Sequence, residues 1–291
     1  MTWEETIRFI RTQREYKELV EQSYLDENLQ LNVERFRSSR EFEETLKLLN
    51  DFAPGAATIL DIGAGNGISS AAFAMNGYHV TVAEPDPSET VGCGAIEILK
   101  KELELKNLVV VNAYGEKLPF KDDGFDVVYI RQAMHHASVL DSFILEATRV
   151  LKPGGKLITI RDHVIFDEKD KQQFLLTHPL QKFYGGENAF TEKAYSAAMT
   201  KAEMKILKIL RYYDSPINYF PLTEHQIKNI TFLMKDNFRK SLQKRFGFWA
   251  GKLPFLPLLQ FVSQIRNGEW NDERRIPGRM YSFIAVKQRT L

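Results

Sequence analysis

The sequence predicts an α/β fold built on a mostly parallel sheet. Two observations indicate this class: short apolar runs alternate with helical stretches from Thr58 onward, and a glycine-rich turn directly follows the first of these runs. Such alternation is typical of βαβ units, whose strands lie parallel to one another. A chain of 291 residues is long enough to bury one sizeable core of this kind.

The apolar runs and the helical patterns between them set the order of elements. Helices are expected around 68–76, 88–105, 139–151 and 192–204, and two strands follow the break in alternation and bring the number of predicted strands to seven. The seven predicted strands are 58–62 (TILDI), 79–83 (HVTVA), 108–112 (LVVVN), 125–130 (FDVVYI), 156–161 (KLITIR), 205–213 (KILKILRYY) and 280–287 (MYSFIAVK).

Four segments describe the expected organisation. Residues 1–50 have helical periodicity and form an N-terminal helical cap, 51–214 form the core, 215–278 form a helical insertion, and 279–291 supply the last strand of the core sheet. Within the insertion, the stretch 235–262 begins with several basic residues and ends with a strongly apolar segment. Such a stretch can close over a site as a lid or lie on a membrane surface as a peripheral contact, and we favour the lid, with Trp249 and Phe255 over the acceptor.

Composition narrows the class of protein. Hydrophobic residues make up 44% of the chain and charged residues 26%, as in ordinary soluble globular proteins. There is one cysteine, Cys93, and neither a run of 18 apolar residues nor an apolar stretch of the signal-peptide kind, so we expect a cytoplasmic protein. Basic residues concentrate in the C-terminal part despite a net charge of +1, which gives either a surface for an anionic partner or a solvated face.

The glycine-rich turn has the spacing G-x-G-x-G, at Gly63, Gly65 and Gly67, and opens a helix. Glycines at this position let the backbone approach a ligand at a helix N-terminus. A nicotinamide-binding turn needs its third glycine at position 68, where Ile68 stands, so a nicotinamide-dependent oxidoreductase is the less favoured alternative. Glu84 ends the second strand, where a carboxylate can accept hydrogen bonds from both hydroxyls of a ribose.

Two later blocks complete a pattern that extends over residues 55–162. LPFKDDGFDVVYIRQAMHHAS (118–138) and EATRVLKPGGKL (146–157) follow the glycine turn and Glu84 in an order that resembles the class I S-adenosylmethionine-dependent methyltransferase family, in its methyltransferase type 11-like, small-molecule branch. The resemblance implies a Rossmann-like, seven-stranded and mostly parallel sheet whose last strand is antiparallel. It also implies S-adenosyl-L-methionine as cofactor and methyl transfer as activity.

The resemblance also implies which residues bind the cofactor. Asp61 and the glycines should surround the methionine part, Glu84 the ribose, and Pro85 the adenine. Tyr114 stands where the family often has an acidic residue at the adenine amino group, so this contact departs from the family pattern. The implied cofactor-binding residues are Asp61, Gly63, Gly65, Gly67, Glu84, Pro85, Tyr114, Gly115 and Arg131.

The acceptor is expected near histidines that follow the fourth and fifth strands. His136 and His163 are candidate general bases for O-methylation, because imidazole titrates near neutral pH. The stretch 178–190 resembles a segment of methyltransferases from surface-polysaccharide pathways, which favours a glycan-like acceptor among small molecules; a lipid-linked acceptor is the alternative. The candidate acceptor-binding residues are His135, Arg161, His178, Tyr184 and Asn188.

Other functions are less favoured. The block that DNA base methyltransferases carry after the fourth strand is absent, since Tyr129-Ile130-Arg131-Gln132 stands there, so no nucleic acid partner is expected. Only Asp162 offers a carboxylate where catechol-type enzymes place metal ligands, so no metal is expected. A protein that senses the cofactor or docks on membranes without catalysis remains an alternative, and the sequence does not indicate the oligomeric state.

Overall fold

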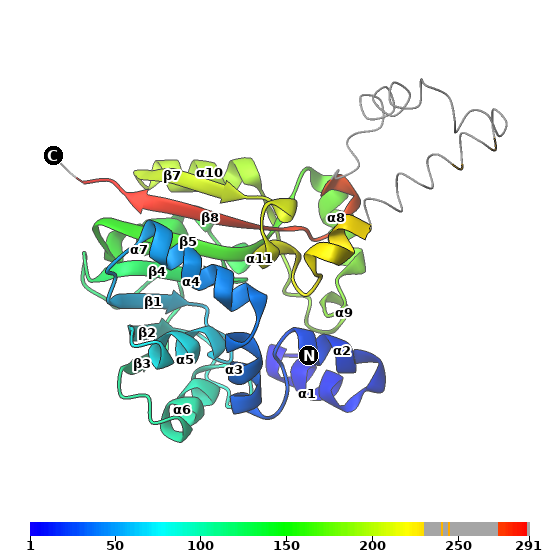
Figure 1. Cartoon of the computed structure of the whole chain (residues 1–291), viewed down its shortest axis with the longest axis horizontal. Helices are drawn as coiled ribbons and strands as arrows, with labels where there is room; N and C mark the ends of the chain where they lie inside the picture. The colour runs from blue at the N-terminus through cyan, green and yellow to red at the C-terminus, as the bar shows by residue number, and fades with distance from the viewer. Residues whose placement is uncertain (230–239, 241–243, 245–272, 290–291) are drawn as a thin grey trace. The chain divides into compact units, whose positions relative to one another are not determined.

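A computed structural model describes residues 1–229, 240, 244 and 273–289 of the chain (Figure 1). The chain divides into two compact units, Met1–Asn218 with Pro277–Leu291 as the first, and Tyr219–Ile276 as the second. The short helix α11 (Pro216–Tyr219) lies at the boundary between the two units, and only its last residue belongs to the second unit. The short helix η5 (Glu273–Arg275) lies near the C-terminal end of the second unit.

The first unit is built around one mixed sheet with the strand order β3-β2-β1-β4-β5-β8-β7. The strands from β3 to β5 are parallel, whereas β8 runs antiparallel to both β5 and β7. The short β6 pairs with β5 off this path. The strands are β1 (Thr58–Ile62), β2 (His79–Ala83), β3 (Leu108–Val111), β4 (Phe125–Arg131), β5 (Leu151–Ile165), β6 (Phe190–Thr191), β7 (Met204–Leu210) and β8 (Met280–Lys287).

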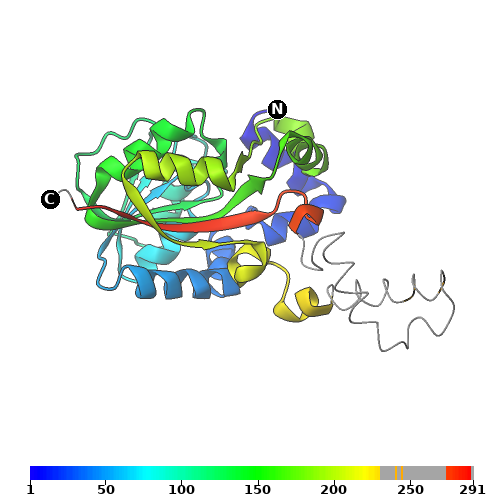
Figure 2. The same ribbon diagram turned by 90° about the horizontal axis from the view of Figure 1, so that it is seen from above.

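Helices cover both faces of the sheet (Figure 2). On one face, α7 and α10 bury Ile144 and Met199 against strand residues such as Leu60 and Val128. On the other face, Phe73 of α5 packs edge-on against Tyr129 of β4, with ring centroids 4.8 Å apart. The two faces alternate along each strand, as the pleat requires, so the buried core has two layers, one on each side of the sheet.

Local capping explains where several helices begin. Thr2 and Glu5 form a capping box at α1, and the side chains of Asn28, Ser39 and Thr191 accept backbone N–H groups at the starts of α3, α4 and α10. The helices of this unit are α1 (Trp3–Thr12), η1 (Arg14–Tyr16), α2 (Lys17–Gln22), α3 (Leu29–Arg37), α4 (Arg40–Phe52), α5 (Ile68–Met75), α6 (Cys93–Glu102), η2 (Met134–His136), α7 (Leu140–Val150), α8 (Glu168–Thr177), α9 (Gln181–Tyr184), α10 (Glu192–Lys201) and η3 (Tyr212–Asp214).

A buried ion pair ties the N-terminal helices to the sheet. Glu41 of α4 is fully buried and accepts two hydrogen bonds from the guanidinium of Arg131, at 2.6 and 3.1 Å. Arg161 lies 3.9 Å from the same carboxylate and donates to the carbonyl of Ile217. The carboxylate therefore neutralises two buried cations, one at the end of β4 and one within β5.

The predicted fold class is confirmed: the sheet is α/β and Rossmann-like, with an antiparallel strand near its edge. Two details of the elements differ from the sequence prediction. β5 begins at Leu151 and ends at Ile165, so it extends beyond the predicted strand 156–161 at both ends. The predicted helix 88–105 shortens to α6, because residues around Gly92 turn sharply to approach Asp86.

The predicted lid or membrane contact at 235–262, with Trp249 and Phe255, lies outside the described residues except for Lys240 and Lys244. Within the described part of the chain, no helix is both long enough and apolar enough to cross a membrane.

Candidate active site

The glycine turn and Glu84 meet at the carboxyl edge of β1 and β2. The backbone N–H of Gly65 donates to one oxygen of the Glu84 carboxylate at 2.8 Å, and the N–H of Asp86 donates to the other at 2.9 Å. Gly65 has φ +57° and no atom within 4 Å of the position that a Cβ would take, so it faces open space. Burial raises the pKa of Glu84 to about 7, although both backbone N–H groups favour its ionised form.

A cavity of about 500 Å³ opens in front of this turn. It extends from the glycine turn, past the ends of β4 and β5, to a group of histidines, and residues of α1 and α2 close it on another side. Parallel sheets bind ligands at this edge. The predicted site residues that line the cavity are Gly63, Gly65, Glu84, Pro85, Tyr114, Gly115, Arg131, His135, His136, His163, His178 and Tyr184.

Four predicted site residues do not line the cavity, and each has a structural reason. Asp61 is fully buried on the α5 side of β1, where one of its oxygens accepts the hydroxyls of Ser69 and Ser70 at 2.9 and 2.6 Å. A Cβ on Gly67 would meet Ile96 of α6 at 2.7 Å, so this glycine permits helix packing.

The other two of the four are predicted acceptor residues. Arg161, at φ +62°, directs its guanidinium toward Glu41 and the Ile217 carbonyl instead of the cavity. Asn188 lies just before β6 and outside the lining. Sequence spacing places a residue near a site but does not give the direction of its side chain.

Tyr114 and Gly115, the two residues expected at the adenine, both line the cavity. Tyr114 is 69% exposed, so its ring stands at the rim of the cavity. Gly115 lies against Phe143 of α7, and a Cβ there would approach this ring to 2.2 Å. This close approach explains why position 115 holds a glycine.

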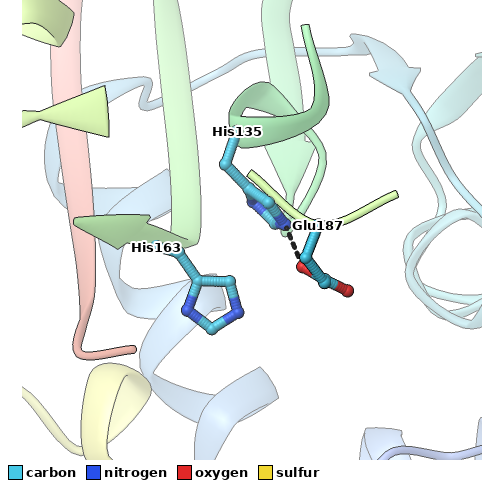
Figure 3. Close-up of side chains that lie close together, drawn as sticks. All are labelled: His135, His163 and Glu187. Carbon is cyan, nitrogen blue, oxygen red and sulfur yellow. Dashed lines mark ion pairs between the residues drawn. The ribbon is translucent and has the colours of Figure 1, made fainter. Parts of the chain in front are cut away.

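A cluster of histidines and one carboxylate forms the other end of the cavity. His135 comes from η2 after β4, His163 from β5, and Glu187 from the segment before β6 (Figure 3). The Nε2 atom of His135 lies 3.6 Å from Glu187 Oε2, and its Nδ1 atom lies 3.1 Å from Asp162 Oδ1. As expected for neighbours on a strand, Asp162 and His163 point apart, and Asp162 contacts His135 instead.

The charges in this cluster follow from its contacts. Burial alone would lower the pKa of His135, but the hydrogen bond that its Nδ1–H donates to Asp162 and the nearby Glu187 carboxylate raise this pKa to about 9. Burial opposes ionisation of Glu187, yet His135 and His178 hold the pKa of this carboxyl well below its usual range. Burial and the charge on His135 lower the pKa of His136 to about 4. One buried cation thus lies between two carboxylates, and the other histidines are neutral.

Several residues of the site were not predicted from the sequence. Glu187 faces the histidines, and an apolar wall is formed by Trp3 of α1, Leu19 of α2 and Leu25 from the segment between α2 and α3. Trp3 and Tyr184 contact each other, with ring centroids 4.8 Å apart. The sequence signal for Trp3 was the amphipathic face of the first helix, and such a face is equally typical of simple core packing. Glu187 lies in the stretch 178–190 expected near the acceptor, but it was not named as a site residue.

Comparisons with known proteins agree with this geometry. A family model described as a methyltransferase domain matches residues 60–159. The chain is 41% identical to a demethylmenaquinone methyltransferase from Clavibacter sepedonicus over 101 residues, which are 34% of this chain and 39% of that protein. Three such relatives are matched over only 28% to 39% of their own length.

Another relative matches a longer part of the chain than the family model does. The chain is 30% identical over 201 residues to the uncharacterized methyltransferase YcgJ of Bacillus subtilis (strain 168), covering 65% of this chain and 74% of that protein. A solved structure of geranyl diphosphate methyltransferase in complex with SAM shares the fold, with a TM-score of 0.53, 13% identity, and coverage of 91% of this chain and 93% of that one.

The sheet, the glycine turn and the ribose-side carboxylate together define a protein that binds a nucleoside-containing cofactor at the carboxyl edge of a Rossmann-like sheet. The chain belongs to the S-adenosylmethionine-dependent methyltransferase family. S-adenosylmethionine is accordingly its cofactor.

Proposed function

We propose that this protein transfers the methyl group of S-adenosylmethionine to a small-molecule acceptor held at the histidine end of the cavity. The observation that supports this most directly is the continuity of the cavity: Gly65 and Glu84 line one end, and His136 and His163 line the other. The cofactor's methyl group and an acceptor can therefore meet in one cavity. Positioning and exclusion of water then supply much of the catalysis.

We further propose an oxygen acceptor with His136 as general base. His136 Nδ1 lies 3.1 Å from the carbonyl oxygen of Gly186, so Nδ1 is the donor and Nε2 carries the lone pair. As the acceptor oxygen attacks the methyl carbon, its proton passes to this Nε2 atom. The carbon–sulfur bond breaks, its electron pair stays on sulfur, and S-adenosylhomocysteine leaves. His163 lines the same cavity and is the alternative base.

A glycan-like acceptor remains our proposal, and the aromatic pair Trp3 and Tyr184 supports it because a sugar ring can lie against such a surface. The competing candidate is a carbon acceptor on a quinone-like ring. It is favoured by the name of the Clavibacter relative and by the apolar wall of Leu19 and Leu25. We also propose a cytoplasmic location, on the grounds of a single cysteine.

The test is methyl transfer from S-adenosyl[methyl-³H]methionine. Purified protein is incubated with extracts separated into polar, glycan and lipid fractions, and label that appears in a fraction identifies the class of acceptor. Label in a glycan fraction supports the first candidate, and label in a quinone-containing lipid fraction supports the second. A protein that binds the cofactor but labels no fraction would contradict the proposed activity and leave a cofactor-sensing function.

A further inference from the structure

Two buried imidazoles and one carboxylate converge at the histidine end of the cavity. Ligand atoms of His135, His163 and Glu187 all lie within 4.8 Å of one another. They come from three separate segments of the chain, as Figure 3 shows. His135 and His163 are 2% and 6% exposed, and the Glu187 side chain is 6% exposed.

The distance between His135 and Glu187 is informative. Their Nε2 and Oε2 atoms are 3.6 Å apart, which is too long for a hydrogen bond. Two ligands on one tetrahedral zinc ion, each about 2.1 Å from the metal, stand about 3.4 Å apart. Glu187 Oε2 is moreover buried without a hydrogen-bond partner. A buried carboxylate oxygen that lacks a partner is costly, and a bound cation would supply one.

Each of the three side chains is also held by a second group. Asp162 accepts the Nδ1–H of His135 at 3.1 Å, the Gly278 carbonyl accepts the Nδ1–H of His163 at 2.8 Å, and the Tyr184 hydroxyl donates to Glu187 Oε1. In both imidazoles Nδ1 is therefore engaged, and Nε2 is the nitrogen left to bind a metal ion, on His135 in exchange for its second proton. Metal-binding histidines are oriented in this way, by a carboxylate or a backbone carbonyl on the other nitrogen.

We propose that His135, His163 and Glu187 bind one divalent transition-metal ion of the zinc type. Two imidazoles and a carboxylate suit such ions, and a set of three protein ligands leaves a coordination position open. All three residues line the cavity, so the ion has an entry path and the open position faces the proposed acceptor site. This departs from our expectation of no metal, which considered only carboxylates after the fourth and fifth strands.

Metal binding would compensate the negative charge of Asp162 and Glu187, and it would decide which histidine can act as the base. The ion takes the place of the proton that His135 otherwise carries between Asp162 and Glu187. With His163 bound to the ion, His136 is left as the base of the proposed reaction. The location of the open position rests on the proposed function, but the binding of the ion does not, because it can be measured without acceptor or cofactor.

The experiment is a titration of the full-length, EDTA-treated protein with Zn²⁺, followed by calorimetry and by elemental analysis after dialysis. We expect one zinc ion per chain. Replacing a ligand, as in His163→Ala or Glu187→Gln, should weaken binding by more than about tenfold, and the orienting change Asp162→Asn should weaken it by about 10- to 100-fold. His79→Gln is the matched control, because His79 is exposed at the start of β2 and does not line the cavity.

Co²⁺ in place of Zn²⁺ adds a spectroscopic readout, since its visible absorption depends on the ligand set. If a ligand variant fails to fold, the wild-type protein decides: Zn²⁺ should raise its melting temperature, and EDTA should reverse the rise. No zinc retained by the wild-type protein, or equal binding by the ligand variants and the control, would overturn the proposal. Separate titration with S-adenosylmethionine distinguishes this failure from failure of the proposed methyl transfer.

Discussion

The contact that we propose between Glu84 and the cofactor ribose allows a quantitative test. In Glu84→Gln the side chain loses its charge. The carboxylate accepts the backbone N–H groups of Gly65 and Asp86, and in the variant one of these N–H groups faces the amide NH₂ group instead of an oxygen. Hydrogen bonds to a charged group contribute about 1.5 to 3 kcal/mol each. Loss of about 2 to 3 kcal/mol corresponds to S-adenosylmethionine binding that is roughly 30- to 150-fold weaker.

The pH dependence gives an independent readout of the same contact. The pKa of Glu84 is raised to about 7 in the free protein, and the ionised carboxylate is the better acceptor for ribose hydroxyls. Binding should therefore tighten as pH rises through 7. With that pKa, the dissociation constant at pH 8 should be roughly tenfold lower than at pH 6.

Isothermal titration calorimetry across this pH range measures both effects. Glu89→Gln is the control, because Glu89 is exposed and does not line the cavity. The reasoning would be refuted if Glu84→Gln bound S-adenosylmethionine with wild-type affinity, or if it kept the pH dependence of the wild-type protein.

Three further predictions concern the turn, the buried ion pair and the base. Gly65→Val should abolish cofactor binding in calorimetry, whereas Gly77→Val, at a similar positive φ outside the cavity, should keep it. Glu41→Ala should lower the free energy of unfolding in urea by about 3 to 5 kcal/mol, against less than about 1 kcal/mol for the exposed Glu43→Ala. His136→Asn should lower kcat about 10²- to 10⁴-fold with cofactor affinity retained; an unchanged kcat excludes the base.

Much of the fold follows from local patterns in the sequence. Each predicted strand overlaps an observed strand, because buried parallel strands are continuous apolar runs that need no tertiary information to detect. The change to antiparallel pairing at β8 was also predicted, but through the family resemblance. The extension of β5 to Ile165 was not predicted, because its polar residues 161–163 indicate the end of a strand.

The candidate site was less predictable. Gly65 and Glu84 were found because their chemistry and spacing are local to one turn and one strand end. Asp61 was expected at the cofactor, but the alternation of the strand turns its side chain toward Ser69 and Ser70. Glu187 was missed as a site residue because only the tertiary fold brings it to His135, 52 positions earlier in the chain.

The central claim is that the cavity in front of the glycine turn binds S-adenosylmethionine. The most direct measurement is calorimetric titration of the wild-type protein with S-adenosylmethionine and, separately, with NAD. We expect saturable binding of one S-adenosylmethionine per chain and no binding of NAD. The binding of S-adenosylmethionine should be lost in Gly65→Val. Binding of NAD in place of S-adenosylmethionine would contradict the account and indicate the oxidoreductase alternative.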